Sequence, residues 1–409
     1  MGWMQGFPPP AARLLSAVDG SFFQFPALRW SVVHMREFLP TVEVSRGIGA
    51  PLPFEYAPDA RIDAVAVKPG GTAQPMTWEE SLALNYTDGI LVLHHGKIVY
   101  ERYFGELQAD RSHAAMSVTK SFTGTLAAIL LAEGKLDPRA RVTKYVPELA
   151  GSAFGDARVR DVMDMTTCLD YSEDYADPGA GVWEYARAGN PLPQPPGDKR
   201  PIGTLAYLQT LQPDRACTPG EAFAYKTPNA DVLGWIIARV SGQSVATLLA
   251  ERIWRQIGME QAAYFQVDAT GLPNAGGGLS AGLRDMARFA QMLLNGGTWQ
   301  GRRILPAAVV ADIRAGGSPR AFARSGHPGL VGWSYRDMWW IAHNPNGAYA
   351  ARGVHGQAIY IDPTADMVIV RFASHPQAAN SANDATSLPA FQAVADHLLS
   401  TSQQQGQHR

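Results

Sequence analysis

The sequence predicts an α/β (α+β) protein: an antiparallel sheet flanked by helices, with an all-helical lobe inserted into it. Runs rich in β-forming residues lie at 90–104 and return at 335–373. Residues 142–282, between those runs, show helical patterns separated by loops rich in Gly and Pro. Short turns join neighbouring strands, which favours hairpin pairing over parallel βαβ winding.

The N-terminal part of the chain divides into an irregular segment and a hairpin. Breakers are frequent in the first 75 residues and periodic patterns are few, so we expect a wrap with short helical pieces. His95-Gly96 then separates two β-rich runs, 90–94 and 97–104. A two-residue turn between such runs predicts a β-hairpin.

Three helices have clear end signals or strong amphipathic patterns. Residues 117–133 keep apolar side chains at helical spacing, and Gly134 follows where a C′ glycine belongs. Thr227-Pro228 has the residue types of an N-cap and a first helical position, and Gly242 closes the helix that they begin. Residues 283–294 form the third and most strongly amphipathic pattern.

The C-terminal part returns to strands. They are expected at 335–342, 357–361 and 367–373, and Asp362-Pro363 makes the turn between the last two. A closing helix is expected at 391–399.

The two predicted lobes follow from this order of elements. Residues 1–112 and 283–409 combine into one α/β lobe, and residues 113–282 form a mainly helical lobe that carries the helix of Ser117. The longest loop, residues 188–203, is either a linker or the wall of a cleft.

Composition excludes several functional classes. The chain has 409 residues, of which 46% are hydrophobic and 18% are charged, with a net charge of -2. This apolar content supports a substantial core rather than a disordered or fibrous chain. Because there is no excess of positive charge to neutralise phosphates, no nucleic-acid partner is expected.

The cysteines and the apolar runs bear on location. Cys168 and Cys217 are the only cysteines. One bridge between them and two reduced thiols are both open, and the second is favoured. No basic segment followed by an apolar run begins the chain, and no uncharged run approaches the roughly 20 residues that span a bilayer. We therefore expect a cytoplasmic protein with no membrane partner, and a homodimer is one possible assembly.

The first chemical signal is the segment around Ser117. Ser117 and Lys120 are three residues apart and so lie on one face of the predicted helix. A serine hydroxyl needs an adjacent base, and a lysine serves only if burial or positive potential lowers its pKa from about 10.4. Such pairs also arise by chance, usually as an N-cap and a solvated lysine, so the pair alone does not define a site.

Three further residues are candidates for the same site, and each has a plainer alternative. Tyr225 precedes the Thr227-Pro228 helix start, where its hydroxyl could face a cleft, but it could equally pack at the helix entrance. His355 lies between glycines that would let backbone approach a ligand, or it satisfies a loop carbonyl. Tyr175 lies in an acidic segment that is typical of a solvated turn.

Taken in order, these motifs resemble the penicillin-recognising serine hydrolases, which include class C β-lactamases, DD-peptidases and related esterases. Within that superfamily the pattern is more similar to the nylon-oligomer (6-aminohexanoate-dimer) hydrolases. The similarity is collinear over most of the chain. It runs through Arg29-Trp30 and the segments 116–122, 145–151, 170–178, 231–235 and 355–357.

The resemblance implies a β-lactamase-like fold, acyl-enzyme chemistry without a metal or cofactor, and a small amide or ester substrate. It implies that Ser117 is the nucleophile, Lys120 its base and Tyr225 the proton carrier. The backbone N–H groups of Ser117 and Val354 would form the oxyanion hole. Substrate-binding residues would be Tyr175, which closes over the substrate, Trp340, which lines the groove, and His355, which supports the strand edge.

The sequence departs from the lactamase pattern at two positions. It departs from the nylon-oligomer pattern at Ala186 and in the loop 274–278, which is small and uncharged. Tyr225-Lys226-Thr227 lacks the asparagine of Tyr–x–Asn, and Val354-His355-Gly356 replaces Lys–Thr–Gly, so efficient β-lactamase activity is not expected. Ala186 stands where an acidic residue would help bind a substrate amino group, with Glu184 nearby. The resemblance therefore implies the acyl-enzyme mechanism, whereas these positions do not supply the charge that would bind the amino end of the dimer.

Other functions remain as alternatives. A short-chain carboxylesterase with little amide activity would use the same residues. A binding protein that has kept the fold and lost turnover is opposed by the presence of Ser117, Lys120 and Tyr225. A metalloenzyme has little support, because the ten histidines form no HExxH or other ligand spacing.

Overall fold

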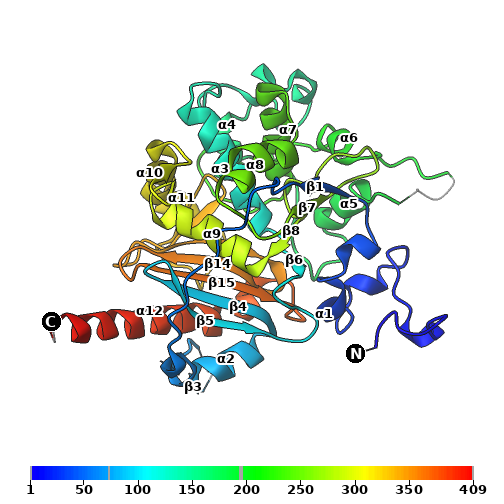
Figure 1. The fold of residues 1–409 in the computed structure, drawn as a ribbon. Coiled ribbons are helices and arrows are strands. Elements are labelled where there is room, and N and C mark those ends of the chain that lie inside the picture. Colours follow the sequence, from blue (N-terminus) through cyan, green and yellow to red (C-terminus); the bar gives the residue numbers. More distant parts are fainter. Residues whose placement is uncertain (1, 72–73, 193–196, 408–409) are drawn as a thin grey trace.

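The structure is a computed structural model that describes residues 2–71, 74–192 and 197–407, without the side chains of 403–407. Its largest sheet has seven strands, and every neighbouring pair is antiparallel (Figure 1). In sheet order the strands are β11 (Ser334–Arg336), β12 (Trp339–Ile341), β13 (Tyr349–Gly353), β14 (Gln357–Asp362), β15 (Met367–Ala373), β4 (Thr87–His94) and β5 (Lys97–Tyr103). Segments from both halves of the chain thus share one sheet.

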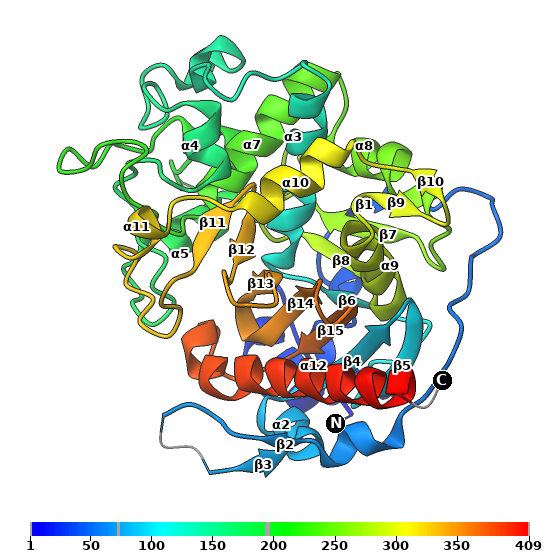
Figure 2. The ribbon, with the colours of Figure 1, turned by 90° about the vertical axis from the view of Figure 1, so that its left-hand side faces the viewer.

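Helices cover both faces of this sheet. One face carries α2 (Trp78–Leu84) and α12 (Asp384–Gln407), which runs across the strands in Figure 2. The other face packs against α9 (Leu283–Leu294) and α3 (Val118–Ala132), which contact the central strands. The sheet is covered on both sides, and for this reason β4, β14 and β15 are buried along almost their whole length and consist mostly of apolar residues.

The part of the fold on the far side of α3 from the large sheet is mainly helical. Its helices surround α3 and α7, and they include α4 (Val159–Met163), α5 (Gly181–Ala188), α6 (Thr204–Leu208), α7 (Pro228–Ser241) and α8 (Val245–Arg252). The remaining helices are α1 (Leu28–Ser31), α10 (Ala307–Ala315) and α11 (Pro319–Phe322).

Smaller sheets complete the fold. A four-stranded sheet joins the N-terminal segment to the helical region in the order β1 (Thr41–Val44), β7 (Ala263–Gln266), β8 (Leu279–Gly282), β6 (Ser112–Ala114). Two short pairs are β2 (Ala66–Val67) with β3 (Met76–Thr77), and β9 (Thr298–Trp299) with β10 (Arg302–Arg303).

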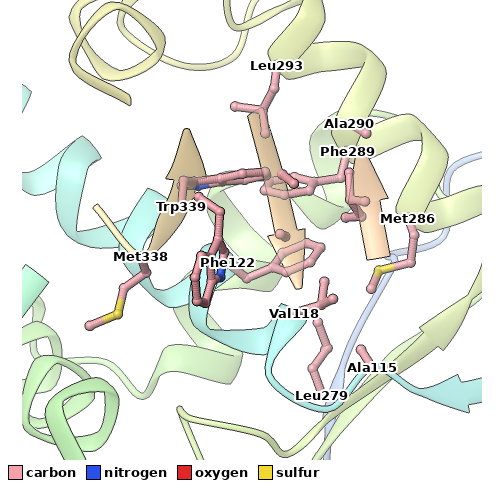
Figure 3. Close-up of a cluster of buried hydrophobic side chains, with 14 of the residues drawn as sticks. Ala115, Val118, Phe122, Leu279, Met286, Phe289, Ala290, Leu293, Met338 and Trp339 are labelled. Atoms are coloured by element: carbon pink, nitrogen blue, oxygen red, sulfur yellow. The ribbon is translucent and has the colours of Figure 1, made fainter. Parts of the chain in front are cut away.

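Aromatic packing fixes α3 against both the sheet and α9 (Figure 3). The ring of Phe122 on α3 stacks on Phe289 of α9 with centroids 3.9 Å apart, and Trp339 of β12 lies 6.2 Å from Phe289. Burial of each such ring contributes about 2–3 kcal/mol. The helix that starts at Ser117 is therefore held rigidly against the sheet.

Several predicted elements are confirmed. The hairpin at His95-Gly96 joins β4 to β5, and both turn residues have positive φ, 49° and 73°, as a type I′ turn requires. Helix α3 has Ser117 as its N-cap, and Gly134 has a φ of 69°. Helix α7 starts at Pro228 and closes at Gly242, and α9 spans the predicted 283–294.

Other predictions need correction. The segment 335–342 is not one strand but the hairpin β11–β12, which turns at Asp337-Met338. Both turn residues have positive φ, 51° and 64°, without the glycine that usually signals such a turn. Packing against α3 stabilises the turn: Ser121 donates to the Met338 carbonyl at 2.7 Å, and a Cβ on Gly124 would lie 2.0 Å from the Asp337 oxygen.

Strand β13 was missed, and the closing helix is longer than predicted. The sequence of β13, Tyr-Ala-Ala-Arg-Gly, has no β-branched residue and takes its place through pairing with β12 and β14. Helix α12 begins at Asp384 rather than near 391 and continues through Pro389.

The favoured prediction of two reduced thiols is wrong: Cys168 and Cys217 form a disulfide. Their separation of 49 residues gives no local signal. Backbone pairing brings them together, because Leu169 bridges Pro213 and the Asp214 N–H donates to the Cys168 carbonyl at 3.1 Å.

The helices of the described segments can be compared with the length and apolar content of a membrane span. No single helix there is long and apolar enough to cross a bilayer. Helix α7 and the following segment Val245–Gln256 reach the required length and apolar content only when taken together, and the two are bent by 67° relative to each other.

Candidate active site

The site is built around the strand-to-helix turn before α3. Strand β6 ends at Ala114, and Met116 takes a φ of 47°, an uncommon conformation for a residue with a side chain. Thr119 fixes the turn: its hydroxyl donates to the Met116 carbonyl at 2.6 Å and accepts the Leu279 N–H of β8 at 3.1 Å. Ser117 is thereby placed at the N-terminus of α3, where the helix dipole contributes positive potential. The N–H groups of Val118, Thr119 and Lys120 are already bonded to the carbonyls of residues 115–117.

Lys120 lies one turn further and is 1% exposed. Its Nζ is 2.8 Å from Ser117 Oγ and 2.7 Å from the carbonyl oxygen of Gly276. Burial lowers the pKa of Lys120 to about 8, although the charges of Glu173 and Asp231 act in the opposite direction. The amine is therefore neutral in a useful fraction of molecules near neutral pH, and it can accept a proton from Ser117.

Tyr225 immediately precedes α7 and faces the same pair. Its ring centroid is 5.1 Å from Lys120 Nζ. Burial and the negative charge of Glu173 raise the pKa of Tyr225, while a hydrogen bond with Ser117 and the charge of Arg352 lower it. The phenol thus remains protonated at neutral pH.

Trp340 of β12 forms one wall beside this tyrosine. Its ring stacks on Tyr225 with centroids 5.4 Å apart, and the Arg352 guanidinium lies 5.0 Å from the Trp340 ring. Phe223, Phe322, Tyr335 and His327 add ring contacts around Trp340. This wall is mainly aromatic and closely packed, and Trp340 in it is 6% exposed.

The end of β13 approaches the nucleophile from the other side. A Cβ on Gly353 would lie 2.9 Å from both the Ser117 nitrogen and the Ala115 oxygen, so only glycine permits this approach. Val354 follows directly. His355 has a φ of 63°, and its Nδ1 is 2.7 Å from the His375 carbonyl, so its ring holds the strand end in place.

Tyr175 lies in the loop that the sequence marks as acidic, and the structure shows what holds it. The Tyr175 hydroxyl donates to Glu173 Oε1 at 2.9 Å. Glu173 also accepts the Thr227 hydroxyl at 2.5 Å and the Thr227 N–H at 2.6 Å. The carboxylate therefore ties this loop to the N-terminus of α7 beside Tyr225.

Ala186 lies apart from the other predicted site residues. It is exposed on α5, as is Glu184, whereas Tyr185 between them is buried and bonds to Asp231. The structure thus brings together Ser117, Lys120, Tyr225, Trp340 and the end of β13, with Tyr175 at the adjoining loop.

Sequence reasoning missed Glu173 and Asp231 as parts of the site. Glu173 was grouped with a solvated turn. Asp231 could have been found from the sequence, because it is the one acidic residue of α7. It lies in the segment 228–237, which is mostly apolar and is buried throughout in the structure. A buried carboxylate on such a face needs a specific partner.

Comparisons with known proteins agree on the fold and on the kind of protein. The family model described as Beta-lactamase matches residues 86–393. The 6-aminohexanoate-dimer hydrolase of Paenarthrobacter ureafaciens is 37% identical over 369 residues, which cover 90% of each chain.

Solved structures point the same way. A Bacillus anthracis protein provisionally described as a 6-aminohexanoate-dimer hydrolase superposes with a TM-score of 0.84 at 33% identity, covering 95% of this chain and 99% of its own. A family VIII carboxylesterase, at 19% identity and a TM-score of 0.53, covers 77% of this chain and 96% of its own and shares the fold.

Proposed function

The chain belongs to the β-lactamase family and is a serine hydrolase that cleaves amide or ester bonds through an acyl-enzyme, and we propose that Ser117, Lys120 and Tyr225 carry this reaction. The observation that carries the proposal is the 2.8 Å contact between Lys120 Nζ and Ser117 Oγ, made by a lysine that burial has brought to a pKa of about 8. A nucleophile and a base at this distance are ready for proton transfer.

Acylation proceeds in two stages. Ser117 Oγ attacks the substrate carbonyl carbon while its proton passes to Lys120 Nζ. The backbone N–H groups of Ser117 and Val354 receive the oxyanion, because the close approach of Gly353 places the end of β13 against Ser117. The tetrahedral intermediate then collapses and expels an amine or an alcohol.

Tyr225 supplies the proton to the leaving group. Its O–H donates to the departing nitrogen or oxygen and is reprotonated from the Lys120 ammonium. Water then attacks the acyl-enzyme by the reverse sequence, which regenerates the Ser117 hydroxyl. The raised pKa of Tyr225 keeps the phenol protonated, so it passes its proton on as the Lys120 ammonium supplies another.

For the substrate we propose a linear amide of the 6-aminohexanoate-dimer type, from which the relative in Paenarthrobacter ureafaciens takes its name. The aromatic wall at Trp340 suits its methylene chain. Tyr175 lies in the loop beside Tyr225 and would close over the substrate once the hydrogen bond from its hydroxyl to Glu173 breaks.

A short-chain carboxylesterase with little amide activity is the second candidate. The observation that favours it is Ala186, which is exposed on α5 and offers no charge to a substrate amino group, while Glu184 points to solvent on the same helix. A penicillin-type substrate is disfavoured because the Thr227 hydroxyl, in place of asparagine, is already bonded to Glu173.

The experiment compares wild type and Ser117→Ala on three substrates: the 6-aminohexanoate dimer, p-nitrophenyl acetate and a chromogenic cephalosporin. Ser117→Ala should lose all hydrolysis while its circular dichroism is unchanged; retained turnover would refute the proposed nucleophile. In wild type, a large kcat/KM preference for the amide excludes the esterase, and the opposite preference excludes the amide as the natural substrate. Cephalosporin turnover should be slow.

Location and assembly stay predictions. A cytoplasmic location was expected from the sequence, whereas a persistent Cys168–Cys217 bond is typical of oxidising compartments. Cell fractionation with thiol labelling distinguishes the two. A homodimer would be tested by light scattering of the purified chain.

A further inference from the structure

Lys120 has two polar partners, and the second is as close as the first. Its Nζ lies 2.7 Å from the Gly276 carbonyl oxygen, compared with 2.8 Å from Ser117 Oγ. A neutral amine that donates one N–H to this carbonyl keeps its lone pair for the serine. The direction of the lone pair therefore depends on where the loop 274–278 holds the Gly276 carbonyl.

That loop is fixed from three sides. Within it, Asn274 Oδ1 accepts the N–H groups of Gly276 at 3.0 Å and Gly277 at 2.7 Å. From α3, the Thr123 hydroxyl donates to the Ala275 carbonyl at 2.8 Å. From α7, Asp231 Oδ1 accepts the Ala275 N–H at 3.0 Å. Ala275 is thus held at both of its peptide groups, directly before the carbonyl that Lys120 uses.

Asp231 is itself held in one orientation. It is 2% exposed, and its second oxygen accepts the Tyr185 hydroxyl of α5 at 2.7 Å. The fit is tight, because a Cβ on Gly276 would lie 2.7 Å from Thr227 Cγ2 and 3.5 Å from Asp231 Oδ2. Asp231 therefore contacts the back of the loop whose front faces the lysine.

We propose that Asp231 is a positioning residue of the hydrolase: it anchors the 274–278 loop so that the Gly276 carbonyl holds Lys120 with its lone pair toward Ser117. The inference rests on the proposed function of Ser117 and Lys120. Asp231 touches neither substrate nor the reacting atoms, and it acts through Ala275 and Gly276.

The charge of Asp231 gives this role a signature in the pH profile. The charged and titratable groups that face Asp231 are Tyr185 from α5, Lys120 from α3 and Asp268 from the loop after β7. Lys120 in turn faces the charges of Glu173 and Asp231. Burial raises the pKa of Asp231 to about 6, so it is ionised where Lys120 titrates, near 8.

The sign of the expected shift follows. An ionised Asp231 stabilises the Lys120 ammonium and so raises the pKa of Lys120. An asparagine at 231 removes this charge, and the acid limb of kcat/KM should then move to lower pH. A residue that only supports the fold would lower activity without moving the limb.

The chain offers a matched control in Asp268. This carboxylate is also buried, at 4% exposed, and it accepts the N–H groups of Thr270 and Leu272 in the segment just before 274–278. Its other oxygen accepts the N–H of Thr204, the first residue of α6. Its charge does not figure among the influences on Lys120. Asp268→Asn should therefore disturb the loop in a similar way and leave the acid limb in place.

The test measures p-nitrophenyl acetate hydrolysis from pH 5 to 10 for wild type, Asp231→Asn and Asp268→Asn, together with the rate of Ser117 labelling by a fluorophosphonate. For Asp231→Asn we expect kcat to fall about a hundredfold with little change in KM, labelling to slow in parallel, and the limb to move down by about one pH unit.

The inference would be overturned if, in Asp231→Asn, the acid limb of kcat/KM stayed at the same pH and Ser117 were labelled at the same rate. An equal shift of the acid limb in Asp268→Asn would also overturn it. If Asp231→Asn does not fold, Tyr185→Phe replaces it, since it removes one donor to the carboxylate; slower labelling at unchanged stability supports the inference, and unchanged labelling overturns it. Failure of the proposed function is separate, because wild type would then show no labelling at Ser117.

Discussion

Replacement of Lys120 by methionine should stabilise the folded chain while it removes activity. Burial lowers the pKa of Lys120 from 10.5 to about 8. Since one pKa unit corresponds to about 1.4 kcal/mol, an ammonium at this position disfavours folding by about 3 kcal/mol. Methionine is similar in length and carries no charge, and loss of the hydrogen bond to Gly276 offsets about 1 kcal/mol. We expect a net gain of about 2 kcal/mol at pH 7.

The pH dependence gives this prediction its sign. Between pH 8 and 10.5, Lys120 is neutral in the folded state and still protonated in the unfolded state, so the stability of the folded chain rises with pH over this range. The free-energy cost of the buried ammonium is therefore complete below pH 8 and disappears as the pH rises toward 10.5. Urea unfolding of wild type and Lys120→Met at pH 7 and pH 10 measures it, with the exposed Lys135→Met as a control that should change little. A variant less stable than wild type at pH 7, or a difference that does not shrink at pH 10, would refute the reasoning.

Three further predictions concern the disulfide, the aromatic wall at Trp340, and Lys120 as the base. The bond between Cys168 and Cys217 spans 49 residues, so the double serine variant should lose about 4 kcal/mol in urea unfolding; an unchanged midpoint would contradict this. Trp340→Ala should raise KM for the 6-aminohexanoate dimer about tenfold with a smaller effect on kcat, and a defect confined to kcat would argue against a binding wall. In wild type, kcat/KM should rise with pH through about 8 as Lys120 loses its proton, and a flat profile from pH 6 to 9 would rule Lys120 out as the base.

Much of the fold could be predicted because its local signals agree with its tertiary structure. The β4–β5 hairpin and helices α3, α7 and α9 have turn, cap or periodic signals that the packing does not override. Their order along the chain placed strands in both the N-terminal and the C-terminal part, with helices between them. The seven-stranded sheet combines strands from these two parts, β4 and β5 with β11 to β15.

The missed elements depend on contacts that are distant in sequence. The Asp337-Met338 turn forms against Ser121 and Gly124 of α3, more than two hundred residues earlier, and no local residue type announces it. The disulfide depends on the pairing of Leu169 with Pro213, which is equally invisible to local patterns.

The site divides in the same way. Ser117 and Lys120 could be placed together from their spacing, since one helix carries both. Tyr225 and Trp340 needed a resemblance to known hydrolases, because they approach from other elements. Glu173 acts through Tyr175 and Thr227, so only the folded chain shows that its carboxylate belongs to the site.

Mapping the residue that a fluorophosphonate modifies, by attack of the nucleophile on phosphorus and loss of fluoride, tests the central claim most directly. The purified chain is treated with a fluorophosphonate, digested, and the modified peptide is sequenced by mass spectrometry, with Ser117→Ala alongside. One label per chain on Ser117, lost in Ser117→Ala and slowed in Lys120→Met, is the predicted result. A label on any other residue, or one that persists in Ser117→Ala, would contradict the assignment of Ser117 and Lys120 as nucleophile and base.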